Sequence, residues 1–346
     1  MIRGEQDTEG IFPAAGHEAW LMNALRKQIG YMRAAVPYWS QRLSSVRVDE
    51  EKIESLADLA ALPILTKTEL RALPPMELVP QEARADVVVC RWTSGTTGRP
   101  TASFWTRSDW AGLISSTARM LGQHAPVATP TVFNAYSQAH VTGPLYHAAL
   151  QELGAAVIDC SHHPEDVFST AQQMRLFDFD TLVMPARTVH GKSVGIDTLL
   201  EQQPGPFDRN KVRWWIGSSG TFDPEVVSQA RAHGIDAISN LYGSSEFAVF
   251  AISCAVRPSE FHVSHGYVLV EVVDDIGAPV RHGQFGRIVV THLTGIDEHG
   301  NARVHCGTQL LRLANGDGAT LLSQPCECGL TSPRLTGIRR MVPATG

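Results

Sequence analysis

The clearest chemical signal in the chain is a loop in which two glycines alternate with hydroxyl side chains. The segment Thr93–Thr101 reads TSGTTGRPT and lies between two expected strands, 87–92 and 102–105. Glycines leave backbone N–H groups accessible, and such amides together with hydroxyls can cradle a polyphosphate. The segment lacks the Gly-Lys-Ser/Thr ending of a Walker loop. It therefore predicts a phosphate-binding loop of another kind, with an ordinary Gly/Thr hairpin as the alternative.

A second candidate segment, Leu241–Glu246, directly follows the expected strand 235–240. Open α/β sheets bind their ligands at the carboxyl ends of the strands. Glu246 offers a carboxylate, which is the kind of ligand that Mg²⁺ prefers. We therefore expect Glu246 to hold Mg²⁺ against the phosphates, and the alternative is a solvated loop glutamate.

Three cysteines and a histidine in the last third of the chain could bind zinc. Cys326 and Cys328 form a C-x-C pair, while Cys254 and His262 could supply two more ligands. A structural zinc ion takes four nitrogen or sulfur ligands in a tetrahedron. We therefore predict a closed structural zinc site, with His265 as the rival fourth ligand. The alternative is a pair of reduced thiols beside an unrelated histidine, since six cysteines are too sparse for a disulfide scaffold.

The elements that must position these motifs alternate along most of the chain. A helix is expected over 18–36, and further helices and strands then alternate over 107–121, 132–136, 145–153, 155–159, 167–176, 181–184, 212–217, 224–232 and 235–240. Such alternation predicts an α/β fold with a mostly parallel sheet flanked by helices. Beyond about residue 254, the strands 267–273 and 287–291 enclose a turn and predict a smaller antiparallel β-rich subdomain. We predict a core over 1–250 and the subdomain over 251–346.

The bulk composition limits the classes of partner. The chain has 346 residues, 43% of them hydrophobic, which is enough for a sizeable core and about two domains. Its formal charge is −6 and it has no Lys/Arg-dense run, so we expect no nucleic-acid partner. Residues 1–7 are polar, and no apolar run approaches the ~20 residues of a membrane helix. We expect a soluble cytoplasmic protein without a membrane partner, and we leave a homodimer open.

Both loop segments carry a resemblance to the adenylate-forming superfamily of acyl-CoA synthetases and peptide-synthetase adenylation domains. They are most similar to the phenylacetate–CoA ligase family, whose phosphate loop resembles Ser94–Thr101, including threonine where most relatives carry lysine. The second motif of that family resembles Tyr242–Glu246. Residues 35–39 and 59–67 are similar to its N-terminal helical segment. The resemblance extends over nearly the whole chain.

The resemblance implies that ATP, Mg²⁺ and a structural Zn²⁺ are the cofactors and that a carboxylic acid is converted to an acyl-AMP with release of pyrophosphate. It implies catalytic roles for Glu246, Thr93 and Thr96. Nucleotide contacts are expected from Thr93, Ser94, Gly95, Thr96, Thr97, Gly98, Ser218, Ser219, Gly220, Asn240, Tyr242, Gly243, Ser245 and Thr308. Without the resemblance, the Ser218–Gly220 segment could equally be a turn that caps a helix.

The acyl group is expected near Tyr136, His140, Trp215 and Gly243. His140 and Trp215 could equally be structural residues. The aromatic side chains favour an aromatic or medium-sized apolar acid, and the compact, divergent form suggests specialised metabolism.

Two departures from the family pattern change the expected chemistry. Thr308 stands where the family has an aspartate that grips the ribose, and a charge-assisted hydrogen bond is about twice as strong as a neutral one. We therefore expect weaker nucleotide binding. The sequence ends at Gly346, where relatives continue into a domain that carries a catalytic lysine. We expect acyl transfer to a thiol or amine, with CoA or a carrier protein as thiol acceptors. The alternatives are a CoA ligase seen without its C-terminal domain and a non-catalytic nucleotide-binding relative.

Overall fold

The contacts between Cα atoms divide the chain into two compact units. In the computed structural model, residues 17–46, 49–92, 100–160, 167–189, 193–201, 207, 211–218, 222–264, 267–293 and 304–341 are described. Unit 1 comprises Met1–Gly112, Ser244–Phe247 and His262–Gly346, and unit 2 comprises Leu113–Gly243 and Ala248–Phe261.

Unit 2 is built on a parallel sheet with the strand order β4-β3-β5-β6-β7. Its strands are β3 (Thr131–Asn134), β4 (Ala156–Asp159), β5 (Thr181–Val183), β6 (Trp214–Ser218) and β7 (Ala237–Ser244). All four neighbouring pairs run parallel. The α/β class predicted from the alternating pattern is therefore confirmed.

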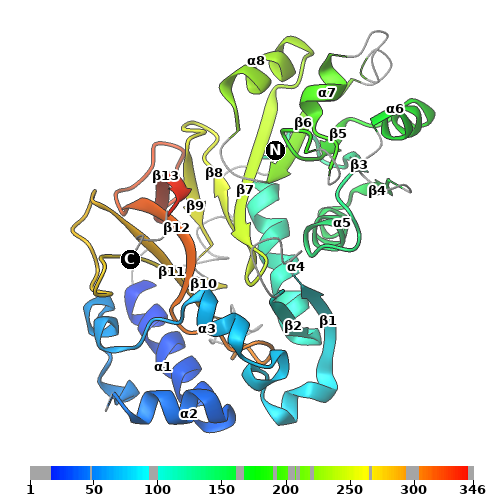
Figure 1. Ribbon diagram of the computed structural model, residues 1–346. Helices are drawn as coiled ribbons and strands as arrows, with labels where there is room; N and C mark the ends of the chain where they lie inside the picture. Colours follow the sequence, from blue (N-terminus) through cyan, green and yellow to red (C-terminus); the bar gives the residue numbers. More distant parts are fainter. Residues whose placement is uncertain are drawn as a thin grey trace. The chain divides into compact units, whose positions relative to one another are not determined.

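Helices connect these strands and cover the sheet (Figure 1). They are α4 (Arg107–Gly122), α5 (Thr142–Glu152), α6 (Val167–Leu176), α7 (Ile196–Leu200) and α8 (Pro224–Ala232). One core cluster combines Phe133, Leu182 and Trp215 of the sheet with residues of α6, α7 and α8. These three helices therefore cover the same face of the sheet.

The side chains of the two adjacent tryptophans in β6 point to opposite faces of that sheet, because successive side chains of a strand alternate in direction. Trp215 belongs to the core cluster beneath α6–α8. Trp214 donates through its Nε1 to the Ser239 hydroxyl at 2.9 Å. His124, which follows α4, contacts the same hydroxyl through Nδ1 at 3.2 Å. Both faces of the sheet are therefore buried, as a parallel sheet requires.

Unit 1 contains the antiparallel strands that the turn-rich pattern predicted. The strands β10 (Val268–Val273), β11 (Phe285–His292), β12 (Leu313–Leu322) and β13 (Arg334–Arg340) pair in this order, each antiparallel to the next. A separate antiparallel hairpin joins β1 (Val87–Trp92) to β2 (Ala102–Thr106). The predicted β-rich subdomain is therefore present.

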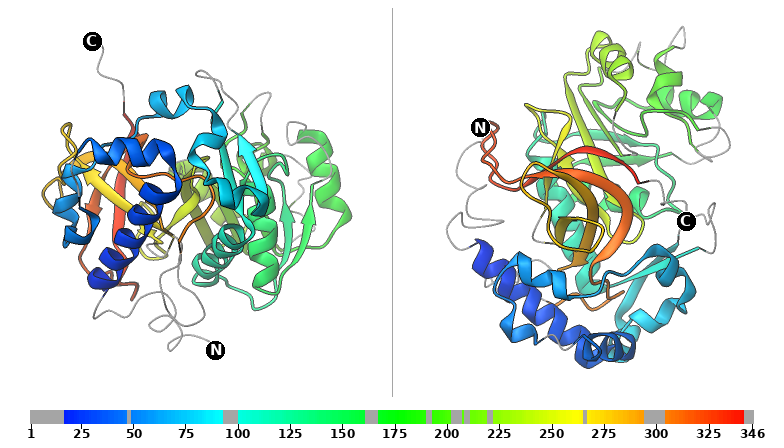
Figure 2. Two further views of the ribbon diagram at one scale, coloured as in Figure 1. Left: turned by 90° about the horizontal axis from the view of Figure 1, so that it is seen from below. Right: turned by 60° about the vertical axis from the view of Figure 1, so that its left-hand side comes forward.

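The N-terminal helices belong to unit 1 as well. They are α1 (His17–Ala35), α2 (Pro37–Ser44) and α3 (Lys67–Ala72), with 3₁₀ helices at 50–52, 56–61, 75–78 and 81–86. Both views in Figure 2 show these helices, in blue, beside the orange and red strands of the same unit. The sequence had grouped residues 1–250 together, whereas the contacts group the N-terminal segment with the β-rich strands.

A buried arginine explains this grouping. Arg312 is 1% exposed, and its Nε and Nη2 atoms lie 3.1 and 3.0 Å from the two carboxylate oxygens of Glu271. Its Nη1 donates to the carbonyls of Leu59 and Leu62 at 2.6 and 2.7 Å, and its Nη2 donates to that of Gly277 at 2.6 Å. A guanidinium group has five N–H donors, and here all of them are used.

The backbone continues this connection towards α3. The Leu65 N–H donates to the Arg312 carbonyl at 3.0 Å, and the Ala314 N–H donates to the Leu65 carbonyl at 2.9 Å. Leu65 thereby forms a parallel bridge with Leu313 at the start of β12. The chain that enters α3 is thus held on the β-rich sheet of unit 1.

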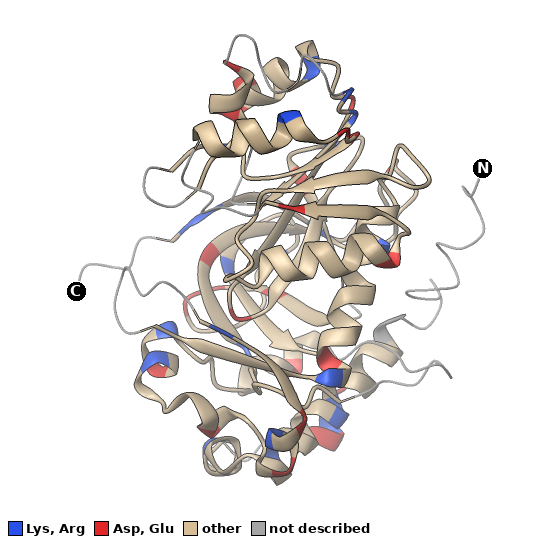
Figure 3. Ribbon diagram, turned by 90° about the vertical axis from the view of Figure 1, so that its right-hand side faces the viewer, with Lys and Arg blue, Asp and Glu red and all other residues tan. Residues whose placement is uncertain are grey.

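Charges are distributed over the elements without segregation by sign. Acidic and basic residues are interspersed on the described ribbon (Figure 3). Among the helices that the structure describes, none combines the length and the apolar character needed to cross a lipid bilayer.

Replacing the buried arginine should destabilise the protein strongly. Arg312→Ala leaves Glu271 buried without its counter-charge and removes one donor from each of three carbonyls, which we expect to lower the free energy of unfolding by about 3–5 kcal/mol. Urea unfolding measures this loss. The matched control is Arg287→Ala, because Arg287 pairs with Asp275, whose side chain is 96% exposed. The control should change stability by less than about 1 kcal/mol. Equal losses in both variants would contradict the assigned role.

Candidate functional site

The predicted phosphate loop connects the two strands of a hairpin. Its residues Thr93, Ser94, Gly95, Thr96, Thr97 and Gly98 lie outside the described residues. The flanking strands β1 and β2 pair in register up to Trp92 and Ala102. Thr101, the residue that leads from the loop into β2, is buried. The two ends of the loop are therefore fixed side by side.

Glu246 occupies the turn between β7 and β8 (Ala248–Ser253), and it is 1% exposed. The Lys67 Nζ lies 3.2 Å from its Oε1 and 3.3 Å from its Oε2. The Thr101 hydroxyl donates to Oε1 at 3.4 Å. This burial is inconsistent with the alternative of a solvated loop glutamate. The carboxylate instead lies beside the end of the predicted phosphate loop.

Lys67 is a site residue that the sequence analysis missed. It is the first residue of α3, and Thr66 precedes it as the helix cap, with a side chain that accepts a hydrogen bond from the Glu69 N–H. Lys67 and Glu246 are 179 positions apart in the sequence. The Thr-x-x-Glu capping box predicts the start of the helix, but it does not predict the partner of its first side chain.

The turn that carries Glu246 depends on a glycine. A Cβ atom at Gly243 would lie 1.8 Å from the carbonyl oxygen of Ala248, so only glycine permits this approach. Ala248 itself has a positive φ of 57°. The Phe247 N–H donates to the Ser244 carbonyl at 3.1 Å and closes the turn. Gly243 therefore shapes the turn, and its predicted contacts with the nucleotide and the acyl group stay predictions.

The other predicted nucleotide residues near this turn differ in exposure. Asn240 is buried, and its backbone N–H donates to the Ser253 hydroxyl at 3.0 Å. Tyr242 is buried and packs edge-on against Phe250, with ring centroids 5.2 Å apart. Ser245 is exposed. Their nucleotide contacts stay predictions.

Thr308 is buried and bound to β2 through both its side chain and its backbone. Its hydroxyl oxygen accepts a hydrogen bond from the Phe104 N–H at 2.8 Å, and its own N–H donates to the Phe104 carbonyl at 2.9 Å. The Thr308 carbonyl lies 2.9 Å from the His292 Nδ1. Within the described part of the chain, the Thr308 hydroxyl donates to no acceptor, and the predicted ribose contact stays a prediction.

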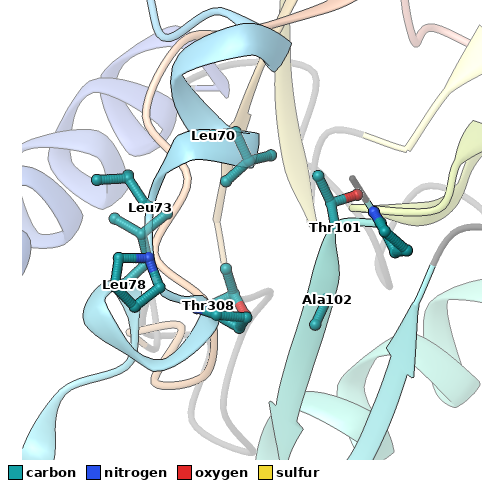
Figure 4. A pocket seen from close by; sticks show the side chains of 9 residues that line it. Leu70, Leu73, Leu78, Thr101, Ala102 and Thr308 are labelled. Atoms are coloured by element: carbon teal, nitrogen blue, oxygen red, sulfur yellow. The ribbon is translucent and has the colours of Figure 1, made fainter. Parts of the chain in front are cut away.

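A pocket of unit 1 brings Thr308 together with the end of the phosphate loop. Figure 4 shows Thr101, Ala102 and Thr308 facing leucines of the N-terminal segment. The pocket is lined by Leu70, Leu73, Pro74, Pro75, Leu78, Pro100, Thr101, Ala102 and Thr308. Thr308, a predicted nucleotide residue, thus shares one mostly apolar cavity with Thr101, the last residue of the glycine-rich segment.

A buried aspartate, also missed in the sequence, fixes the segment that leads to Thr308. Asp109 accepts hydrogen bonds from the N–H groups of Cys306 at 3.1 Å and Gly307 at 2.8 Å. His305 Nδ1 lies 3.4 Å from the Asp109 carboxylate, and the His305 ring stacks on His292 with centroids 4.0 Å apart. Burial lowers the pKa of both histidines, which favours the uncharged form of the stacked rings.

The structure brings two of the predicted acyl and adenine residues together in unit 2. The Tyr136 hydroxyl accepts a hydrogen bond from the Ser218 N–H at 2.7 Å and lies 2.8 Å from the Ser218 carbonyl oxygen, to which it can donate. His140 is exposed. Ser219 and Gly220 lie outside the described residues. Tyr136 thus links the loop after β3 to the end of β6.

Trp215 is fully buried, which favours the core alternative over a substrate contact. Its Nε1 donates to the Met184 carbonyl at 3.0 Å, and its ring stacks on Phe222 with centroids 4.3 Å apart. Both the ring and its polar atom are therefore engaged within the protein.

The four predicted zinc ligands come together. Single ligand atoms of Cys254, His262, Cys326 and Cys328 all lie within 4.8 Å of one another. The Cys328 Sγ lies 3.2 Å from the His262 Nε2, and the His262 Nδ1 lies 3.1 Å from the Ser332 hydroxyl. A second group that holds the other ring nitrogen is typical of metal-binding histidines. The donor set and its spacing fit a tetrahedral zinc ion.

Local structure and ionisation also suit this site. Burial lowers the pKa of His262 to about 4, which keeps the imidazole neutral near pH 7. Gly329 has a φ of +90° and its N–H donates to the Cys326 carbonyl at 3.0 Å, so a tight turn presents the C-x-C pair. All six cysteines are free of disulfides. The rival ligand His265 lies outside the described residues.

Comparison with known proteins identifies a family for most of the chain. Residues 29–294 match the family described as AMP-binding enzyme. The chain is 28% identical over 318 residues to a phenylacetate–coenzyme A ligase of Thermus thermophilus, which covers 90% of this chain and 67% of that protein. It is also 28% identical over 275 residues to the Escherichia coli protein of the same name, covering 75% and 59%. The chain thus spans only 59 to 67% of the length of these relatives.

Solved structures show the same fold. An open conformation of 2-hydroxyisobutyryl-CoA ligase, in complex with 2-HIB-AMP and CoA, aligns with a TM-score of 0.80 at 19% identity. The alignment covers 95% of this chain and 75% of that one. VinN aligns with a TM-score of 0.52 at 20% identity, covering 72% of this chain and 60% of that one. At such identities the likeness concerns the fold.

Adding a single methyl group at Gly243 should disrupt the turn that holds Glu246. In Gly243→Ala the new Cβ would collide with the Ala248 backbone, and we expect a loss of at least about 2 kcal/mol in the free energy of unfolding. The control is Gly112→Ala in α4, where a Cβ would meet nothing within 4 Å. Alanine favours the helix there by up to about 1 kcal/mol. Urea unfolding of both variants tests the difference, and a Gly243→Ala protein as stable as the control would refute the close approach.

Proposed function

Because the chain belongs to the AMP-binding enzyme family, we propose that it activates a carboxylic acid with ATP. In this reaction a carboxylate oxygen of the acid attacks the α-phosphorus of ATP, the bond to the β-phosphate oxygen breaks, and pyrophosphate leaves. The product is an acyl-AMP. The observation that carries the proposal is the buried Glu246 carboxylate at 3.4 Å from Thr101, the residue at the end of the glycine-rich loop.

The residues around this carboxylate suit a phosphate-binding corner. Glu246 would hold Mg²⁺, which supplies charge neutralisation at the phosphates. Thr101 positions the carboxylate through its hydroxyl, and β1 and β2 fix both ends of the loop whose backbone amides would bind the phosphates. Thr308 would donate its hydroxyl proton to a ribose oxygen. Such a site works mainly by positioning and charge compensation.

The substrate and the acceptor follow from the relatives rather than from a measured contact. The sequence relatives are named phenylacetate–coenzyme A ligases. We propose an aromatic carboxylic acid as the substrate, with Tyr136 and His140 near the acyl group, and the CoA thiol as the acceptor. Transfer then forms a thioester and releases AMP. A carrier-protein thiol or an amine is kept as an alternative acceptor.

We further propose that Cys254, His262, Cys326 and Cys328 hold a structural zinc ion. Its support is the convergence of three sulfur atoms and one imidazole nitrogen, together with the Ser332 contact that orients the histidine. Four protein ligands would complete the tetrahedron of a zinc ion, and such a closed site would serve stability rather than catalysis.

ATP–pyrophosphate exchange tests the proposed activity. With Mg²⁺ and a panel of aryl and alkyl acids, we expect exchange that depends on one class of acid, with aromatic acids favoured. Glu246→Gln should lower the exchange rate by about 100-fold at saturating ATP, since it removes the metal-binding charge. Asp275→Asn is the control that removes an exposed carboxylate and should leave the rate unchanged. Full activity in Glu246→Gln, or no exchange with any acid in folded, zinc-loaded protein, would contradict the proposal.

Metal analysis tests the zinc site. Protein purified without chelators should contain about one zinc ion per chain, and Cys326→Ser or Cys328→Ser should lose it. Cys90→Ser, a change to a cysteine outside the cluster, should retain the metal. Removing zinc with a strong chelator should lower Tm, and adding zinc back should restore it. Wild-type protein that takes up no zinc during refolding with excess metal would refute the site.

A further inference from the structure

The carboxylate assigned to Mg²⁺ already has a cationic partner in the protein. The Lys67 ammonium contacts both oxygens of Glu246, at 3.2 and 3.3 Å. We propose that Lys67 is the resident counter-ion of Glu246, that Mg²⁺ displaces it when nucleotide binds, and that the released ammonium then binds the phosphate groups. This inference rests on the proposed function, because it concerns the same carboxylate.

The burial of Glu246 requires a counter-charge when no metal is bound. A carboxylate that is 1% exposed has lost most of its hydration, and an unpaired buried charge is strongly unfavourable. The hydroxyl of Thr101 lies 3.4 Å away, which makes a long and weak hydrogen bond. Among the described residues, Lys67 is therefore the cation that compensates the charge of the Glu246 carboxylate in the absence of Mg²⁺.

The Lys67 ammonium contacts both oxygens of the carboxylate, so a metal ion that binds Glu246 would compete with it for these atoms. Mg²⁺ binds oxygen at about 2.0–2.1 Å and keeps several waters, which need the space around the same two oxygen atoms. Two cations held so close also repel each other strongly where little water screens them. We therefore expect binding of Mg²⁺ to move the Lys67 ammonium away from Glu246.

The structure fixes the backbone of Lys67, whereas its side chain is partly exposed to solvent. Leu65 pairs with Leu313, and the Thr66 cap begins α3 at Lys67, so the Cα position is set. The Lys67 side chain is 21% exposed, and four methylene groups separate its ammonium from the backbone. The ammonium can thus shift over a few ångströms without unfolding the helix, and a lysine is a common partner of phosphate oxygens.

The position of the pair explains where the released ammonium would act. Thr101 touches Glu246 and ends the predicted phosphate loop, whose only basic residue is Arg99. A polyphosphate bound beside Thr101 would bring several negative charges close to the Lys67–Glu246 pair. Exchange of one cation for another therefore keeps the carboxylate compensated throughout and adds a positive charge at the phosphates when they arrive.

Binding of Mn²⁺, a spectroscopic substitute for Mg²⁺, tests the displacement without any turnover. Electron paramagnetic resonance should show weak Mn²⁺ binding to the nucleotide-free wild type. Lys67→Met should bind Mn²⁺ about tenfold more tightly, because the competing ammonium is gone. Lys67→Arg should stay weak, since it retains the charge. The double variant Lys67→Met with Glu246→Gln should lose the gain, which identifies the carboxylate as the ligand.

The matched control is Lys52→Met, which removes a lysine whose side chain is 82% exposed and paired with Asp49. It should bind Mn²⁺ as the wild type does. An unchanged Mn²⁺ affinity in Lys67→Met, or an equal gain in Lys52→Met, would overturn the proposal. If Lys67→Met is poorly folded, Mn²⁺ should raise its Tm more than that of the wild type, and an equal or smaller rise would likewise overturn the proposal.

Calorimetry with a non-hydrolysable ATP analogue tests whether the released Lys67 ammonium binds the phosphate groups. In the presence of Mg²⁺, Lys67→Met should bind the analogue about tenfold more weakly while its affinity for AMP is unchanged. Equal losses for both ligands would contradict a role at the phosphates.

The outcomes separate this inference from the proposed reaction. If the wild type catalyses ATP–pyrophosphate exchange but Lys67→Met binds Mn²⁺ unchanged, the counter-ion role of Lys67 is contradicted and the adenylation activity is supported. If the Mn²⁺ and analogue results are as expected but no acid supports exchange, the adenylation activity is contradicted and the counter-ion role is supported.

Discussion

The position of the candidate phosphate-binding residues Lys67, Thr101 and Glu246 depends on a buried arginine that contacts none of them. Arg312 uses all five of its donors on Glu271 and on carbonyls from two other segments of unit 1. Loss of any partner would leave a buried polar group unsatisfied, so the arrangement tolerates little change. The chain between Leu59 and Leu65 is thereby held on the β-rich sheet. Since α3 starts two residues later at Lys67, the same arginine determines where the ammonium beside Glu246 can lie.

Asp109 likewise fixes a segment of the candidate site, the one that ends at Thr308. It holds the segment Cys306–Gly307, and Thr308 follows directly and pairs with Phe104 on β2. A Cβ at Gly307 would lie 2.1 Å from the Phe104 carbonyl, which shows how closely the two chains approach. Thr101 and Thr308 therefore owe their shared pocket to buried polar contacts rather than to apolar packing alone. Such contacts are directional, and they fix positions more narrowly than apolar contacts do.

The features that could be predicted from the sequence are those that depend on local pattern. The parallel sheet of unit 2 followed from alternating strands and helices, and the C-x-C pair at Cys326 indicated a cluster that the structure assembles. The partners of Lys67 and Arg312 could not be predicted, because they lie 179 and as many as 253 positions away and no local pattern encodes them. The grouping of the N-terminal helices with the β-rich strands was missed for the same reason. Trp215 illustrates a related limit, since a strand's alternation does not tell which face lines a site.

The pairs Arg312–Glu271 and Lys67–Glu246 differ in the burial of the basic side chain and in the length of their contacts. Arg312 and Glu271 are both buried, and every donor of the planar guanidinium is satisfied. Separating them would leave the carboxylate and the guanidinium group buried without hydrogen-bond partners. Lys67 is partly exposed, and its ammonium contacts Glu246 at 3.2 and 3.3 Å, longer than the ~2.8 Å of a strong charge-assisted hydrogen bond. Water can replace Glu246 around the lysine, whereas the buried Glu246 carboxylate would need another cation in its place. We therefore regard the first pair as fixed, and the second as the one that a metal ion would exchange under the proposed function.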